Sequence, residues 1–324
     1  MVRAPRIVYF GTPQFAVPPL EALLDAGYPI AGVVTQPDRP RGRGQRVTSS
    51  PVKAVATARG LAVLQPERLA SPACLDAIGA WEPELGVVAA YGRLLPQALL
   101  DLPRLGFVNV HASLLPRWRG AAPVHRAILA GDARSGVTIM RVALALDAGP
   151  LLSRTVTPID DVETSGTLEA RLSAIGATLL VQTIGRLDEA NLAAIDQDER
   201  DVTYAARLER REGPIDWARP ARDVHNHIRG LQPWPLACAW LHSRRVIVRA
   251  SRVGPQTTPM SDGVAAPGTV VEAHGDRIVV AANPGLVRLT ELQTEGRRPQ
   301  DARSFLNGTR LQAGDRWDPG PERV

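Results

Sequence analysis

The sequence predicts an α/β protein: a Rossmann-like, doubly wound and mostly parallel sheet, followed by a small antiparallel β-barrel. Short apolar runs alternate with helical segments from residue 6 to residue 187, a pattern typical of a parallel sheet with helices on both faces. From Trp240 onward the pattern changes to short strands separated by Gly, Pro and Asn, which favours a barrel. A chain of 324 residues is also too long for one ordinary core.

The elements of the first half follow from apolar periodicity. Continuous apolar runs such as residues 85–91 are typical of strands buried on both faces. Ser71 precedes Pro72, so Ser71 is placed to cap a helix that has Pro72 at its first position. We expect strands at 6–10, 28–35, 61–64, 85–91, 106–111, 136–142 and 151–156, and helices at 17–26, 51–58, 72–80, 95–100, 122–130 and 167–187.

The domain boundaries are predicted from the change in composition. Residues 1–190 form the first domain, and the charged residues 191–211 form a linker. Residues 212–315 form an OB-like barrel domain, and residues 316–324 form a tail. In the second domain we expect a helix at 220–230 and strands at 245–250, 268–272, 277–281 and 286–292.

Composition restricts the class of protein. The net charge of +5 and the pI of about 9.8 permit an anionic partner. Cys74 and Cys238 are the only cysteines, which disfavours a disulfide scaffold. No apolar run is long enough for a membrane helix, and the N-terminus lacks a signal-peptide pattern, so we expect a cytoplasmic protein. The glycine fingerprint of dinucleotide sites is missing after the first strand, which disfavours nicotinamide binding.

Two polar residues at the end of one expected strand are candidates for catalysis. Asn109 and His111 are two positions apart and therefore point to the same face, at the carboxyl end where open α/β sheets bind ligands. An amide can donate to a developing oxyanion, and an imidazole can accept a proton near neutral pH. This pairing suits acyl transfer to an amine. The alternative is a strand end with two solvated polar groups.

A carboxylate near these groups would strengthen the catalytic interpretation. Asp147 begins the turn-forming sequence Asp-Ala-Gly-Pro after the strand at 136–142. If it lies beside His111, it would fix the tautomer of the imidazole and raise its basicity. The alternative is an Asp that caps its own turn.

Residues 39–46 form a cationic loop with four arginines among Gly and Pro. Such a loop could bind nucleic-acid phosphate, or it could simply be a solvated loop. Lys53 is the only lysine of the chain. We predict no metal site, because His225 and His227 would point to different faces of a helix and no acidic or Cys cluster lies near them in the sequence. His125 suits a structural role at the start of a helix.

Together these motifs resemble the methionyl-tRNA formyltransferase family over nearly the whole chain. The Asn, His and Asp set is shared with other 10-formyltetrahydrofolate-dependent enzymes, and the basic loop with the C-terminal barrel points to the tRNA enzymes. The matching segments are residues 10–15, 35–40, 42–44, 50–53, 90–92, 109–120, 136–140, 147–150, 215–217, 233–235 and 289–293.

The resemblance implies a mechanism and a folate site. The folate co-substrate, 10-formyltetrahydrofolate, would lie along Ser113, Leu114, Leu115 and Pro116 and under the turn at Tyr91 and Gly92. The methionyl α-amine of initiator tRNA would attack the formyl carbon. Asn109 would stabilise the oxyanion, His111 would take or relay the amine proton, and Asp147 would orient His111 and a water. No metal is implied.

The resemblance also implies the contacts with RNA. Arg41, Arg43, Arg46 and Lys53 would bind the tRNA, the barrel would hold more of its backbone, and Phe15 would line the methionine pocket unless it is a core aromatic. We expect a monomer that does not bind a membrane. The alternatives are a formyltransferase for a small amine, such as a nucleotide sugar or glycinamide ribonucleotide, and a non-catalytic tRNA-binding module.

Overall fold

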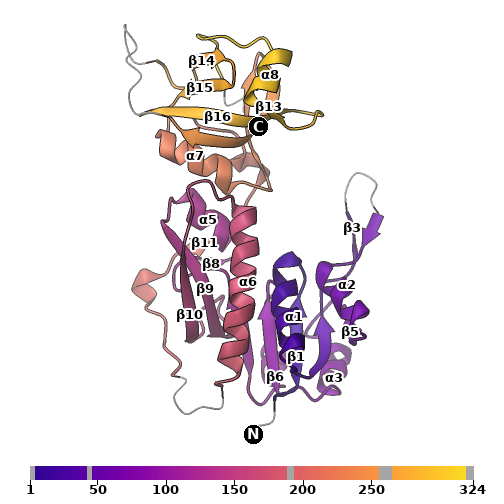
Figure 1. The fold of residues 1–324 in the computed structure, drawn as a ribbon. Coiled ribbons are helices and arrows are strands. Elements are labelled where there is room, and N and C mark those ends of the chain that lie inside the picture. Colours follow the sequence, from indigo (N-terminus) through magenta and orange to yellow (C-terminus); the bar gives the residue numbers. More distant parts are fainter. Residues whose placement is uncertain (1–3, 42–45, 188–192, 255–264, 319–324) are drawn as a thin grey trace. The chain divides into compact units, whose positions relative to one another are not determined.

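The computed structural model describes residues 4–41, 46–187, 193–254 and 265–318. The chain forms two compact units (Figure 1). Unit 1 contains Met1–Pro123, Arg134–Pro158 and Glu169–Ala206, and unit 2 contains Val124–Ala133, Ile159–Leu168 and Arg207–Val324. Among the described residues, no helix is long and apolar enough to cross a membrane.

A seven-stranded sheet forms the centre of unit 1 and confirms the predicted α/β architecture. Its order is β10-β9-β7-β6-β1-β2-β5, and the run from β7 to β5 is parallel. β9 and β10 are antiparallel to their neighbours, which the strand prediction did not specify. The strands are β1 (Ile7–Gly11), β2 (Ile30–Val34), β5 (Val63–Leu64), β6 (Leu85–Ala89), β7 (Phe107–His111), β9 (Arg134–Arg141) and β10 (Leu151–Pro158).

Apolar strands and the helices over them form the core of unit 1. Every residue of β1 is buried, as its continuous apolar run predicts. Phe10 packs edge-on against Tyr91 with ring centroids 5.3 Å apart. The helices are η1 (Gln14–Ala16), α1 (Val17–Asp25), α2 (Pro51–Ala58), α3 (Pro72–Gly79), α4 (Gln97–Leu100) and η2 (Glu199–Asp201), with the long helix α6 (Ser165–Ile184) beginning in unit 2.

Two serines precede helices that have proline at the first position. The Ser50 hydroxyl accepts from the Lys53 N–H at 3.1 Å and caps α2. Ser71 stands at the N-cap of α3 as predicted, but its side chain does not cap the helix. The Ser71 hydroxyl donates instead to the Arg68 carbonyl at 2.9 Å, so a local turn competes successfully with the cap.

The cationic loop is bounded by a short hairpin that the sequence did not predict. β3 (Arg39–Arg41) pairs antiparallel with β4 (Arg46–Thr48). Residues 42–45 between them lie outside the described residues. A second two-stranded sheet pairs β8 (Arg119–Gly120) with β11 (Tyr204–Ala205) in parallel.

Unit 2 contains an antiparallel sheet of order β12-β13-β16-β15-β14, with β17 added to β16. The edge strands β12 and β14 both bond to the segment Asp315–Asp318: Trp240 exchanges hydrogen bonds with Asp318, and the Val270 N–H donates to the Asp315 carbonyl at 2.8 Å. This segment therefore closes the sheet, as the predicted barrel requires. The strands are β12 (Ala237–Leu241), β13 (Arg244–Val253), β14 (Val270–His274), β15 (Arg277–Ala281), β16 (Leu286–Thr294) and β17 (Gln300–Asp301).

Two segments from earlier in the chain belong to unit 2, in contrast to the predicted boundary at residue 190. The Arg229 guanidinium donates to the Asp160 carbonyl at 2.7 Å, and the Ser165 hydroxyl donates to the Gly230 carbonyl at 2.7 Å. The predicted linker, residues 191–211, divides between the units. The remaining helices of unit 2 are α5 (Pro123–Leu129), η3 (Arg210–Glu212), α7 (Ala221–Gly230) and α8 (Ala302–Gly308).

Candidate active site

Strand β7 places Asn109 and His111 on one face at the carboxyl end of the sheet. Asn109 pairs in register with Met140 of β9, and His111 pairs with Thr138. The valines at positions 108 and 110 are buried on the other face. The imidazole of His111 is only 6% exposed, whereas Asn109 is partly accessible. The alternation predicted from the sequence therefore holds, and it presents a protected imidazole beside an open amide.

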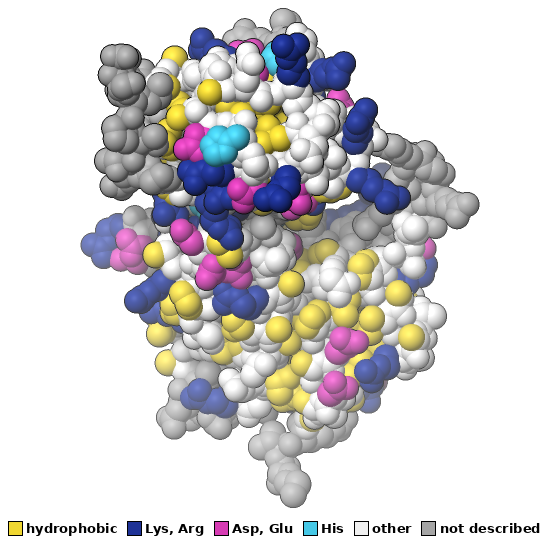
Figure 2. All heavy atoms as spheres, turned by 45° about the horizontal axis from the view of Figure 1, so that its top comes forward, with side chains coloured by type: hydrophobic (Ala, Val, Ile, Leu, Met, Phe, Trp, Pro, Cys, Tyr) yellow, Lys and Arg dark blue, Asp and Glu magenta, His cyan; other side chains and the backbone are white. Residues whose placement is uncertain are grey.

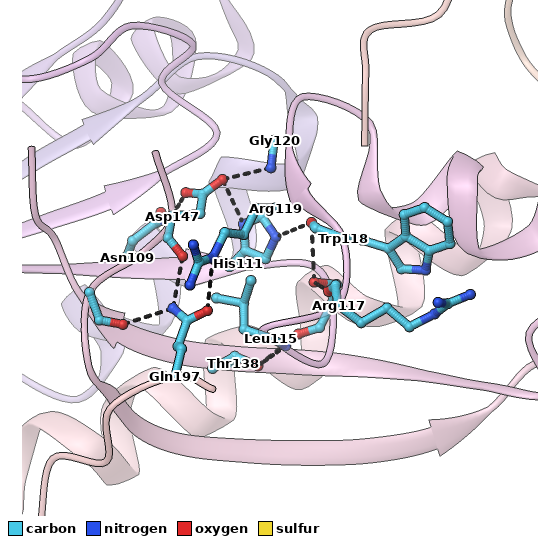
Figure 3. A network of polar contacts seen from close by, with 12 residues as sticks. Asn109, His111, Leu115, Arg117, Trp118, Arg119, Gly120, Thr138, Asp147 and Gln197 are labelled. Carbon is cyan, nitrogen blue, oxygen red and sulfur yellow. Dashed lines mark hydrogen bonds and ion pairs between the residues drawn. The ribbon is translucent and has the colours of Figure 1, made fainter. Parts of the chain in front are cut away.

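Asp147 joins these two residues, as the catalytic interpretation requires (Figure 3). Its Oδ2 lies 3.7 Å from His111 Nδ1, and its Oδ1 lies 3.5 Å from Asn109 Nδ2. The Gly120 N–H donates to Oδ2 at 2.9 Å and fixes the carboxylate. Asp147 also has φ of 49°, a left-handed conformation that Asp tolerates better than most residues. The carboxylate thus contacts three groups rather than capping its own turn.

The hydrogen bonding of His111 determines its tautomer. His111 Nε2 lies 2.9 Å from the Trp118 carbonyl oxygen. A carbonyl can only accept, so Nε2 carries a hydrogen and donates it. Nδ1 faces the Asp147 carboxylate. A proton taken up at Nδ1 would therefore have a carboxylate beside it, and both ring nitrogens of the imidazolium would face an acceptor.

The predicted folate loop is held by backbone and hydroxyl contacts. Thr138 Oγ1 donates to the Ser113 carbonyl at 2.7 Å and accepts from the Leu115 N–H at 3.2 Å. The Ser113 hydroxyl donates to the Arg117 carbonyl at 2.7 Å. The side chains of Ser113 and Leu115 are buried, whereas Leu114 and Pro116 are partly exposed. Any ligand contact of Ser113 and Leu115 would therefore use their backbone.

The turn at Tyr91 and Gly92 is tied to the neighbouring loops. The Tyr91 carbonyl accepts from Gln36 Nε2 at 3.0 Å, and Gly92 has φ of 84°, which favours glycine. The Tyr91 ring is buried, and burial raises the pKa of its phenol to about 12. The exposed Gly92 and the backbone of this turn remain available to a ligand.

The predicted substrate-binding residues lie in different environments. Lys53 pairs with Asp38, whose other oxygen accepts from Gln65 Nε2 at 2.8 Å. Phe15 is 6% exposed, as a core aromatic would be. Arg41 and Arg46 lie on the strands of the hairpin, and Arg43 lies outside the described residues. The substrate contacts of all these residues stay predictions.

Sequence reasoning missed the residues that support the site from outside β7. Gln197 Nε2 donates to the carbonyls of Asp147 and Gly149, both at 2.8 Å. Arg119 is buried, and its guanidinium donates to Gln197 at 3.0 Å and to Glu199 at 2.8 Å. Gln197 and Glu199 lie in the charged stretch interpreted as a linker, and no periodicity or motif there indicates a role in the site.

Gly149 allows two backbone segments to approach closely beside Asp147. A Cβ at this position would lie 1.9 Å from the Arg141 carbonyl oxygen, a backbone atom that cannot move away cheaply. We expect Gly149→Ala to lower the free energy of unfolding by about 1–3 kcal/mol, as overpacking commonly does. Gly79→Ala is the control, because nothing lies within 4 Å of its added Cβ. Equal urea midpoints for the two variants would contradict this prediction.

Across the parts of the chain that the structure describes, no three His, Cys, Asp or Glu side chains come together to hold a metal ion. The histidines of α7 have protein partners instead. His225 Nε2 donates to the Asp161 carbonyl at 2.7 Å, and Nδ1 accepts from the Ser251 hydroxyl at 2.9 Å. Burial lowers the pKa of His225 and of His227.

His125 gives unit 2 a predicted dependence of stability on pH. Burial, with a contribution from Arg126, lowers its pKa to about 4, against an unfolded value of about 6.5. Below pH 6.5 the unfolded chain binds a proton at His125 that the folded chain does not. The contribution of His125 to stability is therefore complete above pH 6.5 and is lost as the pH falls from 6.5 toward 4. In thermal unfolding, we expect His125→Gln to reduce this loss and exposed His274→Gln to leave it unchanged. Parallel curves for wild type and His125→Gln would contradict this.

Two domain families match this chain in succession. A family described as formyl transferase matches residues 5–184, and a formyl transferase C-terminal domain matches residues 207–310. The chain is 47% identical to a methionyl-tRNA formyltransferase from Roseobacter denitrificans, over 95% of this chain and 97% of that one. It is 45% identical to a methionyl-tRNA formyltransferase from Pseudomonas syringae pv. tomato, over 94% of this chain and 95% of that one.

A solved structure shares the fold at low sequence identity. An N-formyltransferase from Helicobacter canadensis, in complex with folinic acid and dTDP-3-aminofucose, superposes with a TM-score of 0.65 at 16% identity. The match covers 90% of this chain and 99% of that one. At this identity the likeness extends to the fold alone.

Proposed function

Because the chain belongs to the methionyl-tRNA formyltransferase family, we propose that it formylates the α-amine of methionyl-initiator tRNA, with 10-formyltetrahydrofolate as donor, in the cytoplasm. The observation that carries the proposal is the convergence of Asn109, His111 and Asp147 at the carboxyl end of β7. Identity of about 45% over nearly the full length of tRNA-acting relatives supports the acceptor. We further propose that the enzyme acts as a monomer.

Asn109, His111 and Asp147 each have a separate role in the acyl transfer. The amine attacks the formyl carbon, a C–N bond forms, and the formyl oxygen becomes an oxyanion. The contact of Asn109 Nδ2 with Asp147 is long, at 3.5 Å, so the amide can turn to donate to this oxyanion. His111 takes the amine proton at Nδ1, directly or through a water held by Asp147. The bond from the formyl carbon to folate nitrogen then breaks, and that nitrogen receives the proton.

The folate would lie between two segments of unit 1. We propose that it contacts the backbone of Ser113 and Leu115, the side chains of Leu114 and Pro116, and the turn at Tyr91 and Gly92. Three observations support this placement: the loop adjoins His111, Thr138 fixes the loop through two hydrogen bonds, and the Helicobacter enzyme of the same fold was solved in complex with folinic acid. The partial exposure of Leu114 and Pro116 leaves apolar surface for a pterin ring.

The tRNA would meet both the hairpin and the C-terminal sheet. We propose that Arg41, Arg43 and Arg46 contact phosphates near the acceptor stem, that Lys53 positions the hairpin through Asp38, and that Phe15 supports the methionine pocket. Basic side chains lie among acidic ones on the forward face of unit 2 (Figure 2). Arg245 pairs with Glu295 and Arg288 pairs with Asp276, both on exposed surface.

Arg43→Ala is expected to raise KM for the tRNA with little change in kcat at saturation, because a phosphate contact contributes to binding rather than to the chemical step. The slope of log affinity against log salt should fall by about one. The matched control is Arg59→Ala, at an exposed arginine that pairs with Asp25. An unchanged KM and salt slope would remove Arg43 from the tRNA site.

The proposed function is tested in one assay. Purified protein is mixed with 10-formyltetrahydrofolate and charged initiator methionyl-tRNA, with charged elongator methionyl-tRNA in parallel, and formylmethionine is scored after deacylation. Product from the initiator tRNA alone supports donor, acceptor and selectivity together. Absence of product from both tRNAs, with folate bound, would reject the tRNA as acceptor and direct the search to small amines.

A further inference from the structure

A segment of unit 1 far from β7 in sequence binds the loop that carries the site. Residues 197–205, called the strap below, contact residues 116–121 through several hydrogen bonds. The Thr203 hydroxyl accepts from the Trp118 N–H, and the Thr203 carbonyl accepts from the Arg119 N–H, both at 2.9 Å. The Ala205 carbonyl accepts from the Ala121 N–H at 2.9 Å. The strap therefore fixes the backbone that provides the acceptor for His111.

Gly120 shows how closely the strap and this loop approach. A Cβ at Gly120 would lie 2.9 Å from the Ala205 carbonyl oxygen, and its φ of 119° also favours glycine. The Gly120 N–H is the donor to Asp147 Oδ2. The strap thus holds the loop residue that orients the catalytic carboxylate.

Gln197 connects the strap to Asp147 directly. Its Nε2 donates to the carbonyls of Asp147 and Gly149, and its Oε1 accepts from Arg119 Nε (Figure 3). This orientation of the amide is fixed by chemistry, because the two carbonyls can only accept and the guanidinium can only donate. One side chain therefore spans the turn at Asp147–Gly149 and joins it to the loop at Arg119.

Asp147 needs such support because its backbone is strained. It adopts φ of 49°, and Trp118, whose carbonyl accepts from His111, adopts φ of 69°. Left-handed conformations of residues other than glycine persist only where the surroundings hold them. The buried Arg119 guanidinium, paired with Glu199, anchors Gln197 from the other side.

We propose that Gln197 is a positioning residue for the formyl transfer: it holds the Asp147 turn in its strained conformation and so sets the carboxylate against His111 and Asn109. The proposal rests on the proposed function, because its readout is formylation. The geometry on which it stands is a chain of hydrogen bonds from Glu199 through Arg119 and Gln197 to the backbone of Asp147.

The first test compares two substitutions at Gln197. In Gln197→Ala the turn loses both donors, and we expect kcat for formylation to fall by about 10- to 100-fold while KM for tRNA and for folate changes little. Gln197→Glu preserves the shape and the acceptor for Arg119 but removes both donors. We expect its kcat to be at least as low. Wild-type activity in Gln197→Glu would mean that the side chain only fills space, and it would overturn the proposal.

The second test asks whether Gln197 acts through Asp147. If it does, Gln197→Ala combined with Asp147→Ala should have the kcat of Asp147→Ala alone, within about twofold. A further loss of about tenfold or more in the double variant would overturn the proposal. Circular dichroism and thermal unfolding are measured for each variant, and a loss of kcat that merely follows the folded fraction would also overturn it.

A control variant and the wild type distinguish failure of the Gln197 proposal from failure of the proposed function. Arg200 lies on the strap, is 88% exposed and pairs with Asp198, so Arg200→Ala should retain full activity. An inactive wild type would reject the proposed function itself. An active wild type with unaffected Gln197→Ala would reject only the role of Gln197.

Discussion

His111→Ala is expected to lower kcat for formylation by about 10²–10⁴-fold, the range typical of a lost general base. The His111 imidazole lies beside Asn109 and Asp147, and its Nδ1 has a carboxylate 3.7 Å away to stabilise the proton it takes up. Affinity for folate should fall little, because the imidazole is 6% exposed and the loop proposed to bind folate is held separately by Thr138.

A second substitution at this position separates proton transfer from packing. The amide of His111→Gln can still donate to the Trp118 carbonyl in place of Nε2, but it cannot take up a proton at neutral pH. We therefore expect His111→Gln to be as slow as His111→Ala and more stable in thermal unfolding. Single-turnover formylation isolates the chemical step from product release. Turnover near wild type in His111→Gln would remove His111 from proton transfer.

Asn109→Ala is expected to lower kcat by about 10²–10³-fold, the usual effect of losing one oxyanion donor. The Asn109 amide is partly accessible, and its contact with Asp147 is long, at 3.5 Å, so its donor is available when negative charge develops on the formyl oxygen. Because the contact with the oxyanion forms mainly in the transition state, kcat and kcat/KM should fall together.

The matched control for Asn109 is Asn307→Ala, on an exposed face of helix α8. It should leave kcat unchanged. A third variant, Asn109→Asp, retains the size of the side chain but replaces the donor with a negative charge, so it should be slower than Asn109→Ala. A rise in KM for folate at constant kcat would instead show that Asn109 contributes to ground-state binding and would contradict its assignment to the oxyanion.

The placement of Asn109 and His111 side by side could be predicted from sequence because it depends on local geometry. Alternation along β7 places Asn109 and His111 on one face in any strand, whatever lies around them. Asp147 could be predicted only as a conditional partner, because β9 runs antiparallel to β7 and ends opposite Val108, so strand order alone does not bring the residue to His111. Ser71 marked the start of α3 for the same local reason, although its hydroxyl prefers the Arg68 carbonyl.

The support of the site could not be predicted because it depends on distant contacts. Gln197 reaches the Asp147 turn across 50 residues, and Arg119 reaches Glu199 across 80. Their polar, aperiodic stretch has the composition of a linker. What distinguishes this stretch from a linker is the folded structure, in which the carbonyls of Asp147 and Gly149 both accept from the Gln197 amide. The hairpin β3–β4 was missed similarly, since proline and glycine indicate a loop.

Unit 2 combines segments from separate parts of the chain, so its C-terminal part is not an independent domain. Arg229 is 6% exposed, and its guanidinium donates to the carbonyls of Asp160 and Glu163, which come from a different part of the chain. A fragment that begins at residue 207 would lack these two acceptors of the Arg229 guanidinium. It would also lack the Ser165 hydroxyl, which donates to the Gly230 carbonyl. A transfer of the C-terminal sheet and its helices to another enzyme must therefore include residues 159–168.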